Sequence, residues 1–142
     1  MIRSKTLSHI GAIGAALTAL SLLPGCAGMG KTPEQQVTER AQERLDLFVA
    51  GDFAQAYEYL SPGYRSSVTL QEYQRKSAAQ PIAWSDAEVA ASDCTENTCK
   101  LRISVEIVVF GAVPGASRFE TRSAVDENWI KSGRTWYMVP AS

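Results

Sequence analysis

The sequence predicts an α+β domain in which N-terminal helices pack on a curved antiparallel sheet, preceded by a cleaved signal peptide. Three observations predict this arrangement. Apolar residues recur at helical spacing from residue 33 to about residue 80, and from residue 82 onward they alternate with polar residues as in half-buried strands. The chain has 142 residues, and removal of residues 1–25 leaves enough for one domain with a single core.

The first 25 residues have the layout of an export signal. Arg3 and Lys5 form a basic head, and residues 10–23 follow without a charge. A membrane-spanning helix needs about 20 apolar residues. The uncharged run is shorter than that and contains Gly11 and Gly14, so a cleaved signal is the better interpretation.

The end of this segment, Leu23-Pro24-Gly25-Cys26, resembles the lipobox of bacterial lipoproteins, with proline unusual at the second position. The resemblance implies cleavage before Cys26, which then carries acyl (palmitate) chains and anchors the protein in a membrane; residues 26–32 are the lipidated cysteine and a short tether. An ordinary cleaved signal is the alternative. Ala27, in the place where aspartate usually marks inner-membrane retention, implies the outer membrane of the bacterial cell envelope, facing the periplasm.

The first helix is expected to begin at Pro33. Thr32 can cap it, proline suits its first position, and Gln35 completes a capping box. Gly51 supplies the C-terminal stop. One apolar stripe at helical spacing is formed by Val37, Ala41, Leu45, Phe48 and Val49.

Two further helices are expected before residue 81. Asp52 can cap the second, which Ser61-Pro62-Gly63 is expected to break. Thr69 with Glu72 matches the start of the third, and Pro81 is expected to end it. Their apolar faces are formed by Phe53, Ala56, Tyr57 and Leu60 in the second helix and by Leu70 and Tyr73 in the third.

Four strands are expected after residue 81, over residues 82–92, 99–110, 117–130 and 135–139, with turns at 111–115 and 131–134. The second is the clearest, since the odd-numbered positions from Cys99 to Val109 are apolar and the even-numbered ones are mostly polar or charged. In the third, Phe119, Val125 and Trp129 share one face. We interpret Asp126 and Glu127 as a solvated strand edge.

The three cysteines are expected to have two different roles. Cys26 is expected to carry lipid, which leaves Cys94 and Cys99 as a pair around a polar four-residue turn. Export to an oxidising compartment favours a structural disulfide that closes a hairpin. A redox-active pair is the alternative, although it would more often be C-x-x-C. A metal site lacks ligands, because the one histidine, His9, leaves with the signal.

Two segments carry a second resemblance. Residues 51–62, Gly-Asp-Phe-Ala-Gln-Ala-Tyr-Glu-Tyr-Leu-Ser-Pro, look like the second-helix signature of NTF2-like domains, which are cone-shaped α+β folds. Residues 129–139 look like the closing hairpin of the same superfamily. The resemblance implies an NTF2-like cone over residues 33–142. The superfamily contains enzymes, transport factors and accessory domains, so it does not decide the function.

Composition excludes several classes of function. Removal of Arg3 and Lys5 with the signal leaves 12 basic and 15 acidic residues, which provides no basic patch for nucleic acid. Without histidine, serine and cysteine triads are excluded. No glycine-rich phosphate loop is present, so no cofactor is expected. The chain is therefore expected to be a non-catalytic binding or accessory module of the envelope.

The aromatic residues and the sheet offer the candidate recognition surfaces. Aromatic side chains can line the mouth of the cone around a small apolar ligand, although the same residues are needed to fill the core. The sheet face of residues 99–110 and 117–130 is the expected contact for an envelope protein or a second copy in a homodimer. The alternative function is a small isomerase or hydrolase that uses a buried carboxylate. The candidate pocket residues are Tyr57, Tyr64, Trp84, Trp129 and Trp136.

Overall fold

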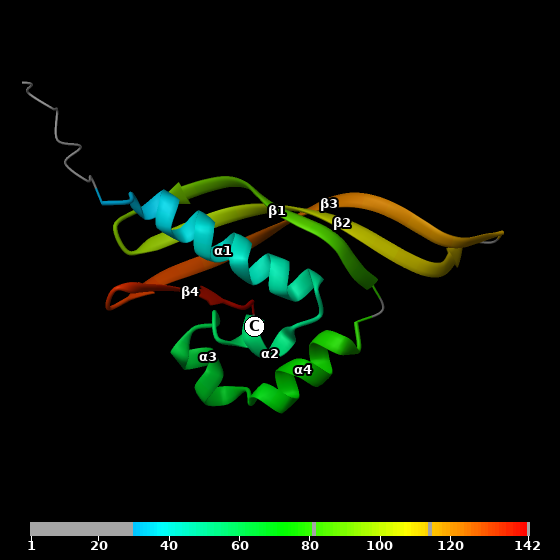
Figure 1. Ribbon diagram of the computed structural model, residues 1–142, viewed down its shortest axis with the longest axis horizontal. Helices are drawn as coiled ribbons and strands as arrows, with labels where there is room; N and C mark the ends of the chain where they lie inside the picture. Colours follow the sequence, from blue (N-terminus) through cyan, green and yellow to red (C-terminus); the bar gives the residue numbers. More distant parts are fainter. Residues whose placement is uncertain (1–29, 81, 114, 142) are drawn as a thin grey trace, which may run out of the picture.

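The computed structural model describes residues 30–80, 82–113 and 115–141. Figure 1 shows the helix over residues 33–49 lying over the sheet, and the shorter helices that follow it grouped beside the last strand of the sheet. The predicted signal peptide, Cys26 and most of the tether lie outside the described residues. The elements, in chain order, are α1 (Pro33–Val49), α2 (Phe53–Tyr57), α3 (Pro62–Ser67), α4 (Leu70–Ala78), β1 (Ile82–Cys94), β2 (Thr98–Val113), β3 (Ala116–Ser132) and β4 (Thr135–Val139).

Helix α1 begins and ends where the sequence predicts. The Gln35 backbone N–H donates to the Thr32 hydroxyl at 3.3 Å, and the Thr32 N–H donates to the Gln35 side chain at 3.0 Å, which completes the capping box. Ala50 caps the other end, and Gly51 follows with a φ of 77°, a conformation that favours glycine. The predicted stripe is confirmed: its first three members are fully buried against the sheet.

The segment after α1 differs from the prediction. Asp52 caps α2 as expected, accepting the Gln55 N–H at 3.1 Å, but the helix ends at Tyr57. The predicted break at Ser61-Pro62-Gly63 is instead the start of α3. Ser61 accepts the backbone N–H of Tyr64 at 3.3 Å, and Pro62 occupies the first helical position. The same residues that stop one helix can therefore start the next.

The chain between α2 and α3 joins the helical layer to the sheet. The Met138 N–H donates to the Tyr59 carbonyl at 2.8 Å, and the Ser61 N–H donates to the Met138 carbonyl at 2.8 Å. Leu60 and Met138 thus form an isolated parallel bridge at the edge of β4. This contact fixes α2, α3 and α4 beside the closing hairpin.

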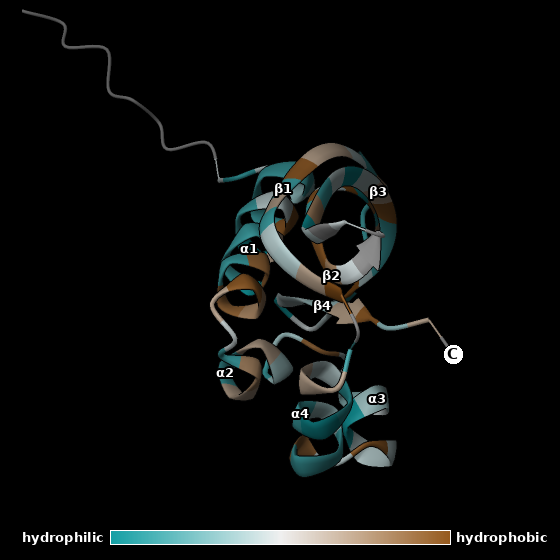
Figure 2. Cartoon of the chain, turned by 90° about the vertical axis from the view of Figure 1, so that its right-hand side faces the viewer, coloured by the Kyte–Doolittle hydropathy of each residue, from teal (hydrophilic) through white to brown (hydrophobic). Residues whose placement is uncertain are grey.

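The four strands pair in the order β1-β2-β3-β4, all antiparallel, which confirms the predicted meander. Two register shifts interrupt β1, between Trp84 and Asp86 and between Val89 and Ala91. Such bulges bend a strand and increase its twist. Figure 2 shows the consequence, a strongly curled sheet with α1 on one side. The α+β class and the packing of helices on a curved sheet are confirmed.

The predicted alternation in β2 holds over its first half. Leu101, Ile103 and Val105 are fully buried in the core formed with α1. Beyond Ile107 the pattern changes, because Val108 is also buried. In β3, Trp129 is buried as predicted, while Phe119 lies beyond the cover of the helices and is 48% exposed.

The side-chain amide of Gln42 links α1 to β1 through one donated and one accepted hydrogen bond, as the backbone of a neighbouring strand would. The Gln42 side chain donates to the Ala87 carbonyl at 2.9 Å and accepts the Val89 N–H at 3.2 Å. Arg40 donates to the Trp136 carbonyl at 2.7 Å, which ties the same helix to β4. These contacts cover backbone groups that an edge strand would otherwise expose.

The predicted disulfide between Cys94 and Cys99 is confirmed. The two residues face each other at the end of the β1–β2 hairpin, with Cα atoms 4.1 Å apart. Cys99 is buried beneath α1, so the bond closes one end of the core. A loop this short contributes about 2 kcal/mol in the chain-entropy model.

Candidate functional site

A hollow of about 300 Å³ opens where the C-terminal ends of α1 and α4 meet the start of β1. We call it the aromatic hollow. Helix α1 contributes its last turn, α2 its first residue, α4 its C-terminal end and β1 its first three residues. The lining residues are Phe48, Val49, Gly51, Phe53, Ser77, Ala78, Gln80, Ile82, Ala83 and Trp84.

Three rings form the wall of the aromatic hollow. The Phe48 ring lies 5.1 Å from that of Phe53 and 5.1 Å from that of Trp84, measured between centroids. Tilted and edge-on contacts of this kind stabilise aromatic clusters. Phe48 therefore holds α1, α2 and β1 together while leaving part of each ring open to the hollow.

The polar groups of the aromatic hollow are few. Ser77 and Gln80 supply the polar side chains, and none of the described residues that line it carries a charge. Apolar walls with a small number of hydrogen-bonding groups are typical of sites for small ligands. The hollow is thus suited to an apolar molecule with one or two polar atoms.

A buried ion pair lies within the core near this hollow. Arg44 of α1, 3% exposed, pairs with Glu127 of β3, 6% exposed. The second carboxylate oxygen of Glu127 accepts the indole N–H of Trp129 at 3.0 Å. The Arg44 guanidinium also lies 5.9 Å from the centre of the Phe48 ring. Both carboxylate oxygens therefore have protein partners.

Tyr73 of α4 connects the ion pair to the short helices. Burial raises the pKa of Tyr73, and the positive charge of Arg44 and the Ser77 hydroxyl oppose that rise. The Tyr73 ring lies 5.5 Å from the ring of Tyr57 in the second core cluster. Ser77 lines the aromatic hollow, so Tyr73 has one neighbour at the hollow and another, Arg44, in the buried ion pair.

The structure separates the five predicted pocket residues. Trp84 lines the aromatic hollow. Tyr57 is buried in the cluster with Leu60 and Tyr73, where its hydroxyl donates to the Val68 carbonyl at 2.7 Å, and Tyr64 packs against that cluster. Trp129 and Trp136 are buried in the main core.

Sequence reasoning missed the most unusual residues of the core. The interpretation of Glu127 as part of a solvated strand edge is wrong, since Glu127 is buried against Arg44. A signal was present: Glu127 has the same strand parity as Val125 and Trp129, and Arg44 has helical spacing to Ala41 and Phe48. An acidic residue on the apolar face of the strand and a basic residue on the apolar face of the helix together indicate a buried ion pair.

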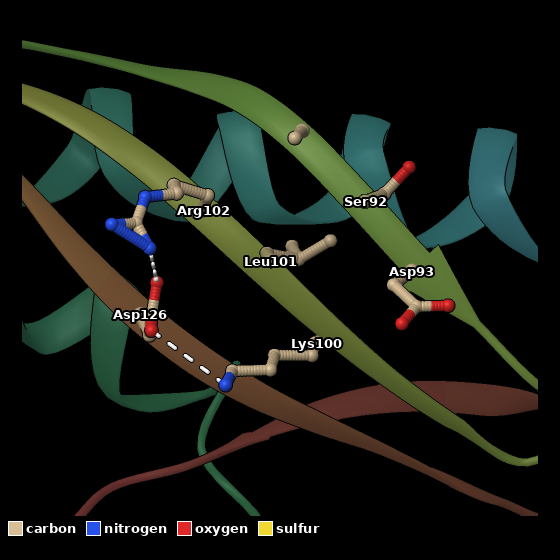
Figure 3. Close-up of a pocket in the computed structure, with 7 residues that line it drawn as sticks. Ser92, Asp93, Lys100, Leu101, Arg102 and Asp126 are labelled. Atoms are coloured by element: carbon tan, nitrogen blue, oxygen red, sulfur yellow. Dashed lines mark hydrogen bonds and ion pairs between the residues drawn. The ribbon is translucent and has the colours of Figure 1, made fainter.

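A second hollow, of about 250 Å³, lies on the sheet face that turns away from α1. Figure 3 shows Arg102 and Lys100 of β2 directed at Asp126 of β3; the nitrogen–oxygen distances are 3.1 Å and 3.7 Å. Exposed pairs of this kind contribute little stability. We interpret this face as a solvated array of ion pairs.

Residues 30–80, 82–113 and 115–141 contain no helix with the length and apolar character to span a membrane. They also contain no group of three or more metal-ligating side chains. The aromatic hollow is the candidate site because its walls are apolar and its polar side chains are few.

The sequence matches no family model, and a search of curated proteins found no significant match. Among solved structures, the chain is similar to a SEC-C motif protein from Rhodopseudomonas palustris, with 13% identity, 71% of this chain and 73% of that one covered, and a TM-score of 0.55. A SEC-C motif protein from Psychrobacter arcticus has 10% identity and a TM-score of 0.55; the match covers 79% of this chain and 63% of that one, less than two thirds of its length.

A proposed NTF2-like transpeptidase from Campylobacter jejuni is also similar, with 14% identity, 78% of this chain and all of that one covered, and a TM-score of 0.49. The likeness to the two SEC-C motif proteins shows a shared fold and nothing about activity, because the sequences differ so widely. The third likeness is weaker still and carries no argument.

Proposed function

We propose that this chain is a lipid-anchored lipoprotein of the bacterial cell envelope whose NTF2-like domain binds a small apolar ligand without chemical turnover. The observation that carries the proposal is the aromatic hollow, with apolar walls, two polar side chains and no charge among its described lining residues. The NTF2-like assignment is supported by the order of elements, helices first and then an antiparallel meander.

The state of Glu127 supports binding over catalysis. A carboxylate that acts as a base needs a free oxygen within reach of a substrate. In this protein one oxygen of Glu127 pairs with Arg44 and the other accepts from Trp129. Asp52 is likewise engaged, as the cap of α2.

The charged outer sheet face supports a small ligand over a protein docked on that face. Its side chains are arranged in ion pairs, including Arg102 with Asp126 and Arg118 with Glu120. Docking a protein there would require those charges to lose water, which is costly unless the partner matches them. The aromatic hollow offers apolar surface without that cost.

Filling the aromatic hollow is expected to weaken ligand binding. Ala78 lines the hollow and is exposed on α4, so Ala78→Trp places an indole in the hollow without disturbing the buried core. We expect the dissociation constant for N-phenyl-1-naphthylamine, an uncharged fluorescent probe, to rise about tenfold or more. Titration of probe fluorescence measures it.

Ala79→Trp is the matched control, because Ala79 is also exposed and is the next residue along the chain, outside the lining of the hollow. It should leave the dissociation constant within about twofold of the unmodified protein. Equal binding by both variants, or no saturable binding by the unmodified protein, would contradict the proposed site.

Anchoring is tested at Cys26. Cys26→Ser removes the thiol that the lipobox resemblance assigns to lipid, and burial of acyl chains contributes about 0.8 kcal/mol per CH₂ to membrane association. We expect the variant to lose its acyl groups in mass spectrometry and to leave the membrane fraction. Acylation that persists in the variant would show that the anchor lies elsewhere.

A small isomerase or hydrolase is the second candidate, and one observation favours it: Glu127 is a carboxylate buried inside the domain. Panels of ester, lactone and steroid-isomerase substrates test it. Turnover that disappears in Glu127→Gln, in a variant that still shows the native circular dichroism spectrum, would place the protein in the enzyme class.

A further inference from the structure

Strand β3 has a long free edge. Strand β4 pairs only with the last residues of β3, from Asn128 to Ser132. Within the described part of the chain, the residues of β3 before Asn128 have β2 as their strand partner and nothing paired on the other side. Residues 117–124 are exposed on both faces of the sheet.

The backbone of this edge is ready to pair with another strand. The Lys131 N–H donates to the Asn97 carbonyl, on the β2 side of β3. Strand geometry has a period of two, so the even-numbered residues of β3 direct their N–H and C=O groups toward the free edge. An uncovered edge of this kind is a template for strand addition.

The side chains of the edge are self-complementary. Arg118 and Glu120 lie on the outer face, form an ion pair with each other and are each about half exposed. Phe119, between them, lies on the opposite face by the alternation of a strand and is 48% exposed. An antiparallel copy of the same strand, centred on Phe119, brings Arg118 of each strand opposite Glu120 of the other.

We propose that the free edge of β3 pairs with the same edge of a second copy of this chain, so that two four-stranded sheets join into one. The two-fold axis passes beside Phe119. Phe119 faces its own counterpart in a non-hydrogen-bonded pair, the closest kind of antiparallel pair. Arg118 and Glu120 of both copies form a ring of four alternating charges on the outer face.

The position of β4 favours this register. With the axis at Phe119, the paired segment runs from residue 116 to residue 122, and the tip of the partner hairpin ends short of Asn128. A shift of the axis to Thr121 would extend pairing to residue 126 and bring the partner tip against β4. The register centred on Phe119 leaves room for both β4 and the tip of the partner hairpin.

Charge reversal tests the pairing. Glu120→Arg places arginine opposite arginine twice in each dimer, and Arg118→Glu places glutamate opposite glutamate. Each single variant is expected to raise the dimer dissociation constant about tenfold or more, because facing like charges are destabilising. The double variant, Arg118→Glu with Glu120→Arg, restores the ring and is expected to dimerise as the unmodified protein does.

The measurement is sedimentation velocity over a wide range of concentration, on the processed protein isolated from cells in a density-matched detergent. Glu96→Arg is the matched control, since Glu96 is exposed in the β1–β2 turn far from the edge, and it is expected to leave dimerisation unchanged. A monomer at every concentration would overturn the proposal. So would a dimer indifferent to both single variants, or a double variant that fails to restore association.

Discussion

Glu127→Ala is expected to lower the free energy of unfolding by about 3–5 kcal/mol, because it leaves the buried guanidinium of Arg44 without its counter-charge. It also removes the acceptor of the Trp129 indole N–H. The stability of a domain of this size is about 5–15 kcal/mol, so much of it would be lost. Denaturant unfolding followed by circular dichroism measures the change.

The ion pair as a whole is expected to contribute much less to the free energy of unfolding than the removal of one of its members costs. Replacement of both charges, with Arg44→Met and Glu127→Leu, should restore most of the stability, since apolar packing can substitute for a buried ion pair. Glu96→Ala, in the exposed turn, is the control and should change the free energy by no more than about 0.5 kcal/mol. A small effect of Glu127→Ala would show that water compensates Arg44.

Trp136→Ala is expected to cost about 3–5 kcal/mol, because it empties the centre of the main core. Trp136 lies on β4, is 2% exposed and packs in the cluster that includes Trp129 and Leu45. A loss of this size should lower the midpoint of thermal unfolding by more than about 10 °C. Scanning calorimetry measures it.

Trp136→Phe separates packing from hydrogen bonding. The indole N–H of Trp136 is buried and has no hydrogen-bond partner among the described residues. Phenylalanine keeps an aromatic ring and removes that unpaired donor, so the loss should be clearly smaller than for alanine. Equal losses in the two variants would mean that the donor makes a contact with ordered water.

Local signals made most of the secondary structure predictable. The capping box at Thr32 and Gln35 placed the start of α1, and the alternation from Leu101 to Val105 placed the inward face of β2. The prediction of a simple break at Ser61 and Pro62 was incomplete, because the residues that interrupt a helical pattern are also those that begin a helix. A pattern confined to a few residues does not distinguish the two.

The candidate site was less predictable than the fold. Phe48 and Phe53 were identified as core residues on separate helices, and only the turn at Gly51 brings their rings together. Trp84 joins them because β1 starts beside the end of α1. Aromatic residues fill cores and line ligand sites alike, so their presence in a sequence does not say which of them remain open.

Local features of the sequence predict the α+β class, helices before strands, the meander and the Cys94–Cys99 disulfide, since caps, periodicity and pairing across a short turn are local properties of the chain. The tertiary structure decided which residues meet across long separations. Arg44 and Glu127 are 83 positions apart, and only the packing of α1 on the sheet makes them partners. The aromatic hollow and the free edge of β3 are decided in the same way, by where α4 ends and where β4 stops covering its neighbour.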